Sequence, residues 1–204
     1  MEASSNSSSS DAPTISSSSE DSREWETIFE KSFEGYKDND FAFFQEGYST
    51  GNSKFGSNYL NLIDPEGYMR TPDIEGLSGE LKVELYCHVT NLNNLTAAAV
   101  GETFAFSLST IDYSIDEDGF STSTPTDTYS YSHTVTAEDV TNKALPDIPP
   151  YTSDFSAAPI VAYLNADGAD RLLVRMDDKI EFNGQGCNLA LGRIVVMKAG
   201  TPNS

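Results

Sequence analysis

Apolar and polar side chains alternate over residues 81–89, the longest regular stretch of the chain. The apolar positions are Leu81, Val83, Leu85, Cys87 and Val89, and the polar positions between them are Lys82, Glu84, Tyr86 and His88. A period of two directs one set to one face of a sheet and the other set to the opposite face. The stretch therefore predicts a long, half-buried strand. A shorter extended piece over residues 68–72 precedes it, because a proline disfavours the α conformation in the residue before it.

Other stretches show the same alternation or end at turn signals. The strands expected from them cover residues 25–34, 57–63, 101–115, 126–137, 158–164, 169–182 and 186–198. The last two meet at Asn183-Gly184-Gln185-Gly186, which predicts a hairpin. Residues 36–58 keep no steady period and read as a long loop packed by its own aromatic side chains. Single helical turns are expected at residues 96–100 and 137–142.

These patterns predict about eight strands and hardly any helix. The chain also carries 10 Tyr and 11 Phe, enough large rings to fill the space between two sheets. An all-β sandwich with long corner loops is the packing solution expected for such a set of strands.

One domain is expected, over residues 25–199. Residues 1–24 are rich in serine and acidic side chains, which bury too little apolar area to offset the entropy of ordering, and they read as a disordered tail or spacer. Residues 200–204 read as a short C-terminal tail. No stretch in residues 1–24 resembles a signal peptide, although Met1 can stand in place of a removed export signal.

The chain is strongly acidic. Its 12 Lys and Arg against 32 Asp and Glu give a formal charge of −20. Such a charge repels phosphate backbones and anionic lipid headgroups, so nucleic acid is not expected as a partner. No apolar run approaches the roughly 20 residues of a spanning helix, so direct membrane insertion is not expected either.

The order of several short motifs resembles the galactose-binding-like jelly rolls. The motifs are FEKSFEG at residues 29–35, NYLNLI at 58–63, YMRTPDIEGLSGELKVELYCHV at 68–89 and CNLALGRIVVMK at 187–198. They are most similar to the cleaved-adhesin and MAM-like modules of surface proteins from Bacteroidetes-type bacteria. The resemblance spans roughly residues 28–198, and it implies a jelly-roll β-sandwich of antiparallel strands.

The resemblance also implies a role. It suggests a non-catalytic binding module for carbohydrate, or for host or matrix adhesion, with a glycan or a surface protein as partner. The expected location is the bacterial cell surface, as an outer-membrane lipoprotein, or outside the cell. Two alternatives stay open: a structural or assembly module of a surface complex, and a concanavalin-like glycoside hydrolase, which would need two carboxylates facing each other in an open groove.

A structural calcium ion is a further expectation. Related jelly rolls bind one near the end of the first strand, and Glu30, Asp38 and Asp40 offer the carboxylate oxygens that calcium prefers, with Glu34 and Asn39 nearby. A solvated acidic loop is the alternative. Family members often carry an acidic residue near the start of the last strand, where this chain has Gly192-Arg193, and a guanidinium repels a divalent cation.

Glycan binding needs aromatic rings that stack on sugar C–H faces, with polar groups beside them. Four candidates meet that description: Tyr86 and His88 on the polar face of the long strand, and Tyr36 and Tyr48 in the loop that follows the first strand. Ordinary packing is the alternative for each of them.

Neither the cysteines nor the histidines form a known catalytic or metal-binding motif. Cys87 and Cys187 are far apart in sequence, and they can be two buried thiols or one disulfide between strands. His88 and His133 lie in no nucleophile or zinc motif, and no phosphate-binding glycine loop is present. Glu84, on the polar face of the long strand, is a candidate acid for glycoside hydrolysis. The alternative is that it is an ordinary charged surface residue.

Overall fold

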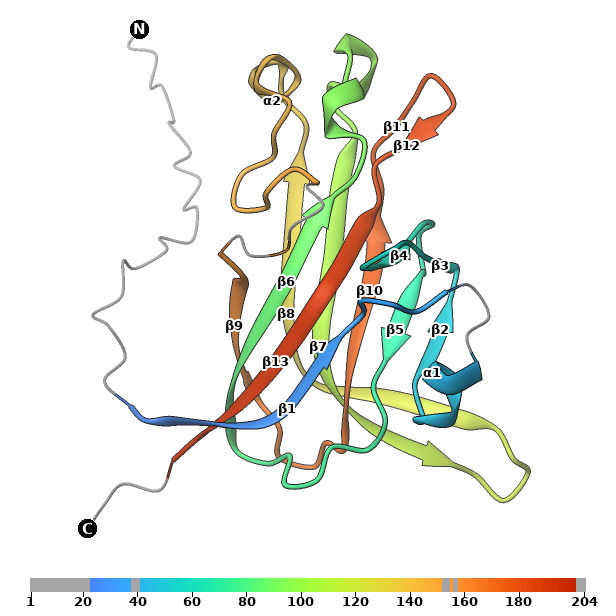
Figure 1. Ribbon diagram of the computed structural model, residues 1–204, viewed down its shortest axis with the longest axis vertical. Coiled ribbons are helices and arrows are strands. Elements are labelled where there is room, and N and C mark those ends of the chain that lie inside the picture. The colour runs from blue at the N-terminus through green and yellow to red at the C-terminus, as the bar shows by residue number, and fades with distance from the viewer. Residues whose placement is uncertain (1–22, 38–40, 152–154, 156–157, 201–204) are drawn as a thin grey trace, which may run out of the picture.

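The computed structural model describes residues 23–37, 41–151, 155 and 158–200. Within these residues the chain forms thirteen strands, two α-helices of five and six residues and two 3-10 turns. The long strands make two antiparallel sheets that lie face to face (Figure 1). The predicted all-β sandwich is therefore confirmed. Neither helix is long and apolar enough to cross a membrane. Of the tails predicted at residues 1–24 and 200–204, residues 1–22 and 201–204 fall outside the described residues.

The first sheet, sheet A, has the strand order β3-β4-β13-β6-β9, and β1 also pairs with β13. Its strands are β1 (Trp25–Ser32), β3 (Ser53–Phe55), β4 (Leu60–Leu62), β6 (Glu80–Val89), β9 (Ile160–Asn165) and β13 (Leu189–Ala199). The first residues of β13 pair with β4, and the rest of that strand pairs with β1. The long predicted strand, β6, thus lies beside β13 near the middle of the sheet.

The second sheet, sheet B, has the order β2-β5-β10-β7-β8. Its strands are β2 (Ser49–Gly51), β5 (Tyr68–Arg70), β7 (Thr103–Ile115), β8 (Ser121–Thr134) and β10 (Arg171–Asp178). The remaining elements are α1 (Phe41–Gln45), η1 (Leu92–Asn94), η2 (Ala97–Ala99), α2 (Ala137–Asn142), β11 (Glu181–Phe182) and β12 (Gln185–Gly186). Both predicted helical turns are present, as η2 and α2.

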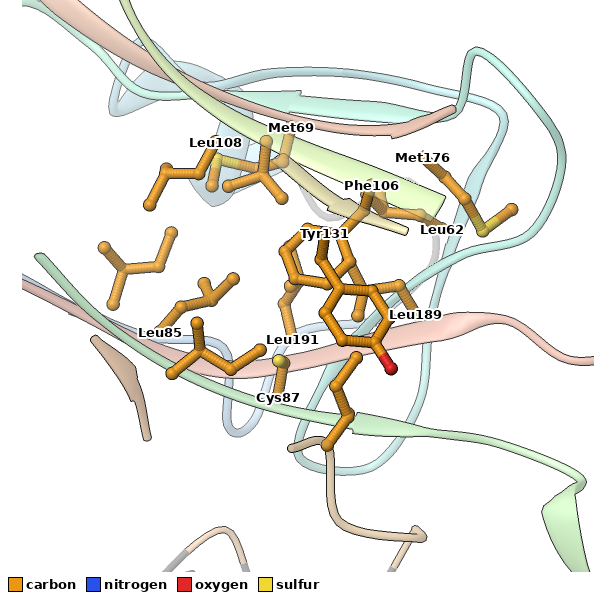
Figure 2. Packing of buried hydrophobic residues seen from close by; sticks show 14 of the residues in the cluster. Leu62, Met69, Leu85, Cys87, Phe106, Leu108, Tyr131, Met176, Leu189 and Leu191 are labelled. Carbon is orange, nitrogen blue, oxygen red and sulfur yellow. The ribbon is translucent and has the colours of Figure 1, made fainter. Parts of the chain in front are cut away.

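The core lies between the sheets and follows the predicted alternation. The apolar side chains of β6, which are Leu81, Val83, Leu85, Cys87 and Val89, are at most 3% exposed. In Figure 2, Leu85, Cys87 and Leu191 of sheet A face Phe106 and Leu108 of sheet B. Burying one such side chain stabilises the fold by about 1.5–3 kcal/mol, so this face of β6 fixes how the two sheets pack.

The hairpin predicted at residues 183–186 has the expected tight turn, but the two long strands expected to pair through it do not pair with each other. Asn183 and Gly184 both have positive φ, 50° and 75°, as the tight turn between β11 and β12 requires. That ribbon is only two residue pairs long. The long strands on either side separate, because β10 joins β7 in sheet B while β13 joins β6 in sheet A. The local turn signal therefore does not decide the partners of the long strands.

The segment expected as a loop at residues 36–58 contains α1, β2 and β3. Three-residue strands are too short to show a period, so the sequence pattern did not indicate them. The aromatic side chains of this segment pack against one another, as expected. Phe43 is fully buried, and the centre of its ring lies 4.5 Å from that of Tyr48 and 5.0 Å from that of Phe55.

Candidate functional site

Two of the four residues predicted to stack on a glycan, Tyr36 and Tyr48, lie around the side chain of Lys31. The Lys31 ammonium lies 4.5 Å from the ring centre of Tyr36 and 4.9 Å from that of Tyr48. It also pairs with Glu46, and the Tyr36 hydroxyl donates to that carboxylate at 2.9 Å. Burial of Lys31 favours its neutral form, but its hydrogen bonds to Glu46 and Tyr36 raise its pKa above the usual value. The ammonium therefore takes the place that a ligand would occupy on these rings.

The other two predicted residues lie on the outer face of sheet A, as expected from the alternation. His88 is only 1% exposed, and its ring stacks on Phe155 with 4.3 Å between ring centres. Tyr86 is half-buried, with the Arg193 guanidinium 4.1 Å from its ring centre, and its hydroxyl donates to Glu84 at 3.0 Å. Both rings are thus engaged by neighbouring side chains of the chain itself.

The residues of the expected calcium site are only partly described. Glu30 is exposed and its Oε1 lies 3.3 Å from Nη1 of Arg193. Asp38 and Asp40 lie outside the described residues. Within the described part of the chain, no group of three or more His, Cys, Asp or Glu side chains could hold a metal ion. Calcium binding here stays a prediction.

Glu84 is arranged as an ion-pair partner. Its Oε1 lies 2.9 Å from the Lys82 ammonium. Partial burial favours its neutral form, but hydrogen bonds from Lys82 and Tyr86 lower its pKa below the usual value. A general acid in glycoside hydrolysis needs the opposite shift, because it must hold a proton near neutral pH. The geometry of Glu84 does not support an acid catalyst.

A different aromatic pair lies on the outer face of sheet A, made by Trp25 of β1 and Tyr163 of β9. Their ring centres are 5.8 Å apart and the rings are tilted by 49°. The strands β13 and β6 separate β1 from β9, so the two rings meet across the surface of those strands. Tyr163 is 50% exposed, and the neighbouring Val161 is 39% exposed. We call this pair the Trp25–Tyr163 platform.

A β-bulge directs Trp25 outward. The register between β1 and β13 shifts between Thr27 and Phe29, so Phe29 pairs with the buried Val196 while Trp25 pairs with Ala199. Without that shift, Trp25 and Phe29 would face the same side of the sheet. The guanidinium of Arg23 lies 5.0 Å from the Trp25 ring centre and forms an ion pair with Glu80. A cation of the chain itself therefore contacts the Trp25 ring, and Tyr163 is the more exposed ring of the platform.

A hollow of about 390 Å³ is lined in part by Tyr163, and we call it the Tyr163 hollow. Its lining residues are Gly79, Glu80, Asp127, Tyr163, Leu164, Asn165 and Asp167. Backbone amides hold two of its carboxylates in place: Asp127 Oδ2 accepts from Asn165 N at 2.7 Å, and Asp167 Oδ1 accepts from Gly79 N at 3.0 Å. Oxygen atoms fixed in this way form a preorganised set of hydrogen-bond acceptors beside an exposed aromatic ring.

The sequence contained part of the signal for this site. The alternation over residues 158–164 already put Val161 and Tyr163 on one face of a strand, and Trp25 is the single tryptophan of the chain. Nothing in the local pattern showed the bulge in β1 or placed β1 and β9 on one sheet. The meeting of the two rings is therefore a product of the tertiary structure.

No protein-family model matches the sequence, and no curated protein is significantly similar to it. Several solved structures do match. The K1 cleaved adhesin domain of Lys-gingipain from Porphyromonas gingivalis W83 is 14% identical, with 85% of this chain and 98% of that chain covered and a TM-score of 0.36. The K3 domain of the same protein is 15% identical, with coverages of 75% and 72% and a TM-score of 0.31.

A third match is the CBM22-1–GH10 part of endo-1,4-beta-D-xylanase 10B from Clostridium thermocellum, solved with xylohexaose. It is 12% identical, with a TM-score of 0.34, and the match covers 86% of this chain and 29% of that chain. The two gingipain domains belong to the cleaved-adhesin modules that the sequence motifs resemble.

Proposed function

We propose that this protein is a non-catalytic carbohydrate-binding module that holds its ligand on the Trp25–Tyr163 platform. The observation that supports the proposal is an aromatic pair, the half-buried Trp25 and the exposed Tyr163, bordered by fixed hydrogen-bond acceptors. Aromatic rings bind the C–H faces of sugars, and oxygen acceptors receive the hydrogens of sugar hydroxyls. A surface that combines both on a rigid sheet suits a glycan better than a purely apolar ligand.

The platform is rigid, which favours binding. Each ring has only two side-chain torsions, and both project from paired strands of sheet A, so little conformational entropy is lost when a ligand docks. Its surface is also open, which fits an extended chain of sugars lying across the strands better than a small molecule that must be enclosed. We further propose that the module acts on a bacterial cell surface or outside the cell, where glycans are accessible.

A glycan array followed by titration calorimetry tests the proposal. We expect the full chain to bind at least one neutral oligosaccharide on an array that includes cellohexaose, xylohexaose, mannohexaose and N-acetyllactosamine. Trp25→Ala and Tyr163→Ala should each weaken that binding by about tenfold, because each removes one stacking ring. Phe120→Ala is the matched control. Phe120 is 72% exposed, but it lies in the turn between β7 and β8 of sheet B and not on sheet A, so its loss should not change the affinity.

Binding that survives both platform substitutions would contradict the assignment of the site. The absence of any bound glycan, for a folded protein, would contradict the proposed function as a whole.

A structural or assembly module is the second candidate, because one observation favours it. The end of the β7–β8 hairpin carries Ile115 and Phe120, which are 62% and 72% exposed and are the two most exposed large apolar side chains among the described residues. Such side chains mark contact surfaces when they gather at one place. This candidate gains support if light scattering shows a stable oligomer that Phe120→Ser converts to a monomer, and it loses support if both proteins are monomers.

A further inference from the structure

We infer that the Tyr163 hollow makes the platform selective for glycans without acidic groups, so that uronic acids, sialic acids and sulfated sugars are rejected there. This inference rests on the proposed function and names the ligand class of the same site. Glu80, Asp127 and Asp167 bring three carboxylates to the hollow, and one cation, Arg23, pairs with Glu80. A sugar ring stacked on Tyr163 would lie next to the hollow that these oxygens line.

The fixed positions of the carboxylates matter for selectivity. Asp127 accepts from the backbone amides of Asn165 and Thr128, at 2.7 and 2.8 Å, and Asp167 accepts from that of Gly79. Side chains held in this way cannot rotate away from an incoming anion without losing those hydrogen bonds. Their remaining lone pairs can still accept hydrogens from sugar hydroxyls. The same oxygens therefore attract a neutral sugar and repel an acidic one.

Two cations beside the platform are already paired with carboxylates. Arg23 pairs with Glu80 and lies over Trp25, and Lys82, the direct neighbour of Tyr163 across the strand pair, pairs with Glu84 at 2.9 Å. An acidic substituent would have to displace one of these carboxylates to gain either of these two cations. The formal charge of −20 on the whole chain acts in the same direction.

The size of the discrimination follows from Coulomb's law. Two like charges ~5 Å apart in water disfavour binding by about fourfold, and two or three carboxylates together give a discrimination of about tenfold or more. Salt screens such exposed charges, because the Debye length is about 8 Å at physiological ionic strength. The discrimination should therefore shrink when the salt concentration rises to about 1 M.

Matched glycan pairs test the inference on the full chain. We would compare N-acetyllactosamine with its sialylated form, and xylohexaose with a xylo-oligosaccharide that carries a glucuronic acid, by array and calorimetry. For any backbone that binds, we expect the acidic form to bind about tenfold more weakly in low salt. Equal or tighter binding of the acidic form would overturn the inference, even if the neutral form binds and the proposed function holds.

Charge-removing variants connect the effect to the hollow. Glu80→Gln and Asp167→Asn keep an oxygen acceptor and remove a charge. Each should reduce the discrimination, measured as the ratio of neutral- to acidic-glycan affinity for the same variant, about two- to fourfold. Asp177→Asn on β10 of sheet B is the matched control, and it should leave the discrimination unchanged. If Asp177→Asn lowers the discrimination as much as Glu80→Gln and Asp167→Asn do, the effect comes from the net charge of the chain. That result would overturn the role of the hollow.

Discussion

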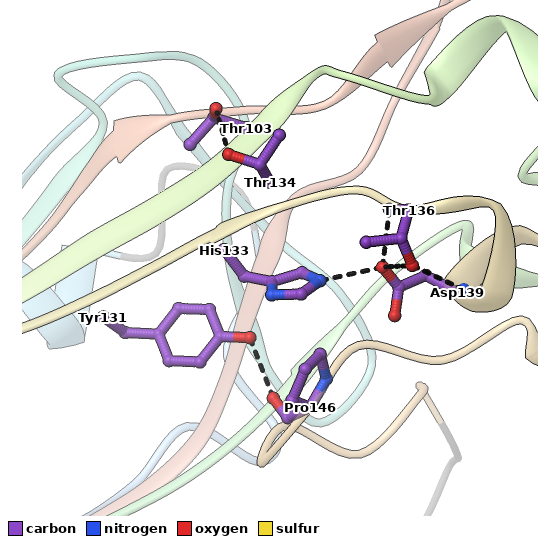
Figure 3. A network of polar contacts seen from close by, with 7 residues as sticks. All are labelled: Thr103, Tyr131, His133, Thr134, Thr136, Asp139 and Pro146. Atoms are coloured by element: carbon purple, nitrogen blue, oxygen red, sulfur yellow. Dashed lines mark hydrogen bonds and ion pairs between the residues drawn. The ribbon is translucent and has the colours of Figure 1, made fainter. Parts of the chain in front are cut away.

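A single carboxylate oxygen ties the end of β8 to the start of α2. Oδ2 of Asp139 accepts hydrogen bonds from His133 Nε2 at 2.8 Å, from the Thr136 amide at 2.7 Å and from the Thr136 hydroxyl at 2.8 Å (Figure 3). Thr136 caps the helix in return by accepting from the Asp139 amide. Burial of Asp139 favours its neutral form, but these hydrogen bonds lower its pKa below the usual value. This capping box stabilises the helical turn expected at residues 137–142.

Asp139→Asn should therefore destabilise the protein in a pH-dependent way. A carboxyl whose folded pKa is lowered stabilises the fold at pH values above its unfolded pKa of about 3.9, and that stabilisation is lost as the pH falls through the folded value. We expect a loss of about 1–2 kcal/mol in the free energy of unfolding at pH 7. The difference from wild type should become smaller below about pH 3. Urea unfolding at both pH values measures it.

The exposed Asp73 provides a control for the Asp139 experiment. Asp73→Asn should change the free energy of unfolding by less than about 0.5 kcal/mol at either pH. A loss for Asp139→Asn that stays constant from pH 7 to pH 3 would show that the carboxylate charge is not the stabilising feature.

At the scale of elements, the β7–β8 hairpin is longer than the sheet that supports it. The last residue of β7 paired with β10 is Ile111, yet the pairing of β7 with β8 continues to Ile115 and Ser121. Beyond Ile111 the hairpin is a two-stranded arm (Figure 1), and isolated two-stranded ribbons are marginally stable in water. Tyr113 anchors the arm, with the guanidiniums of Arg70 and Arg171 at 4.0 and 4.1 Å from its ring centre.

Tyr113→Ala should loosen this arm without unfolding the sandwich. Two cation–π contacts at about 0.5–1 kcal/mol each correspond to roughly a tenfold change in local opening. Hydrogen exchange with mass spectrometry should show about tenfold faster exchange over residues 112–126 and unchanged exchange in β6. Tyr163→Ala, on the other sheet, is the control. Faster exchange throughout the core would show instead that Tyr113 supports the whole fold.

At the scale of the whole molecule, the two sheets share one core that includes both cysteines. Cys87 lies on β6 and Cys187 just before β13, and both are free, buried thiols. Burial raises the pKa of each thiol to about 12. Of the two alternatives that the sequence left open, the structure has the pair of buried thiols.

Both thiols should react with iodoacetamide only when the sandwich unfolds. Because the thiolate is the reactive form, a high pKa and burial together should slow labelling of the native protein at least about a hundredfold relative to the unfolded chain. A single cooperative core predicts that both cysteines become reactive over the same range of urea concentration. Mass spectrometry of labelled peptides measures this. Labelling of one cysteine well before the other would indicate that part of the core opens separately.

The candidate site was less predictable than the fold. The sequence placed Tyr86 and His88 on the correct face of the sheet, but it could not show that Arg193 and Phe155 cover them. Tyr48 is 6% exposed, because the residues expected to form a loop fold back as α1 and β2. Side-chain exposure depends on neighbours that come from distant parts of the chain, and a local period carries no information about them.

The sequence by itself determined what depends on near neighbours along the chain: the all-β class, the buried face of β6, the tight turn at Asn183 and Gly184, and the capped turn of α2. Alternation and turn geometry are local, so a few residues suffice to specify them. The tertiary structure decided the partners of β10 and β13, and it brought Trp25 and Tyr163 together. Those outcomes depend on which apolar faces pack best against each other over the whole domain, and that is a property of no single segment.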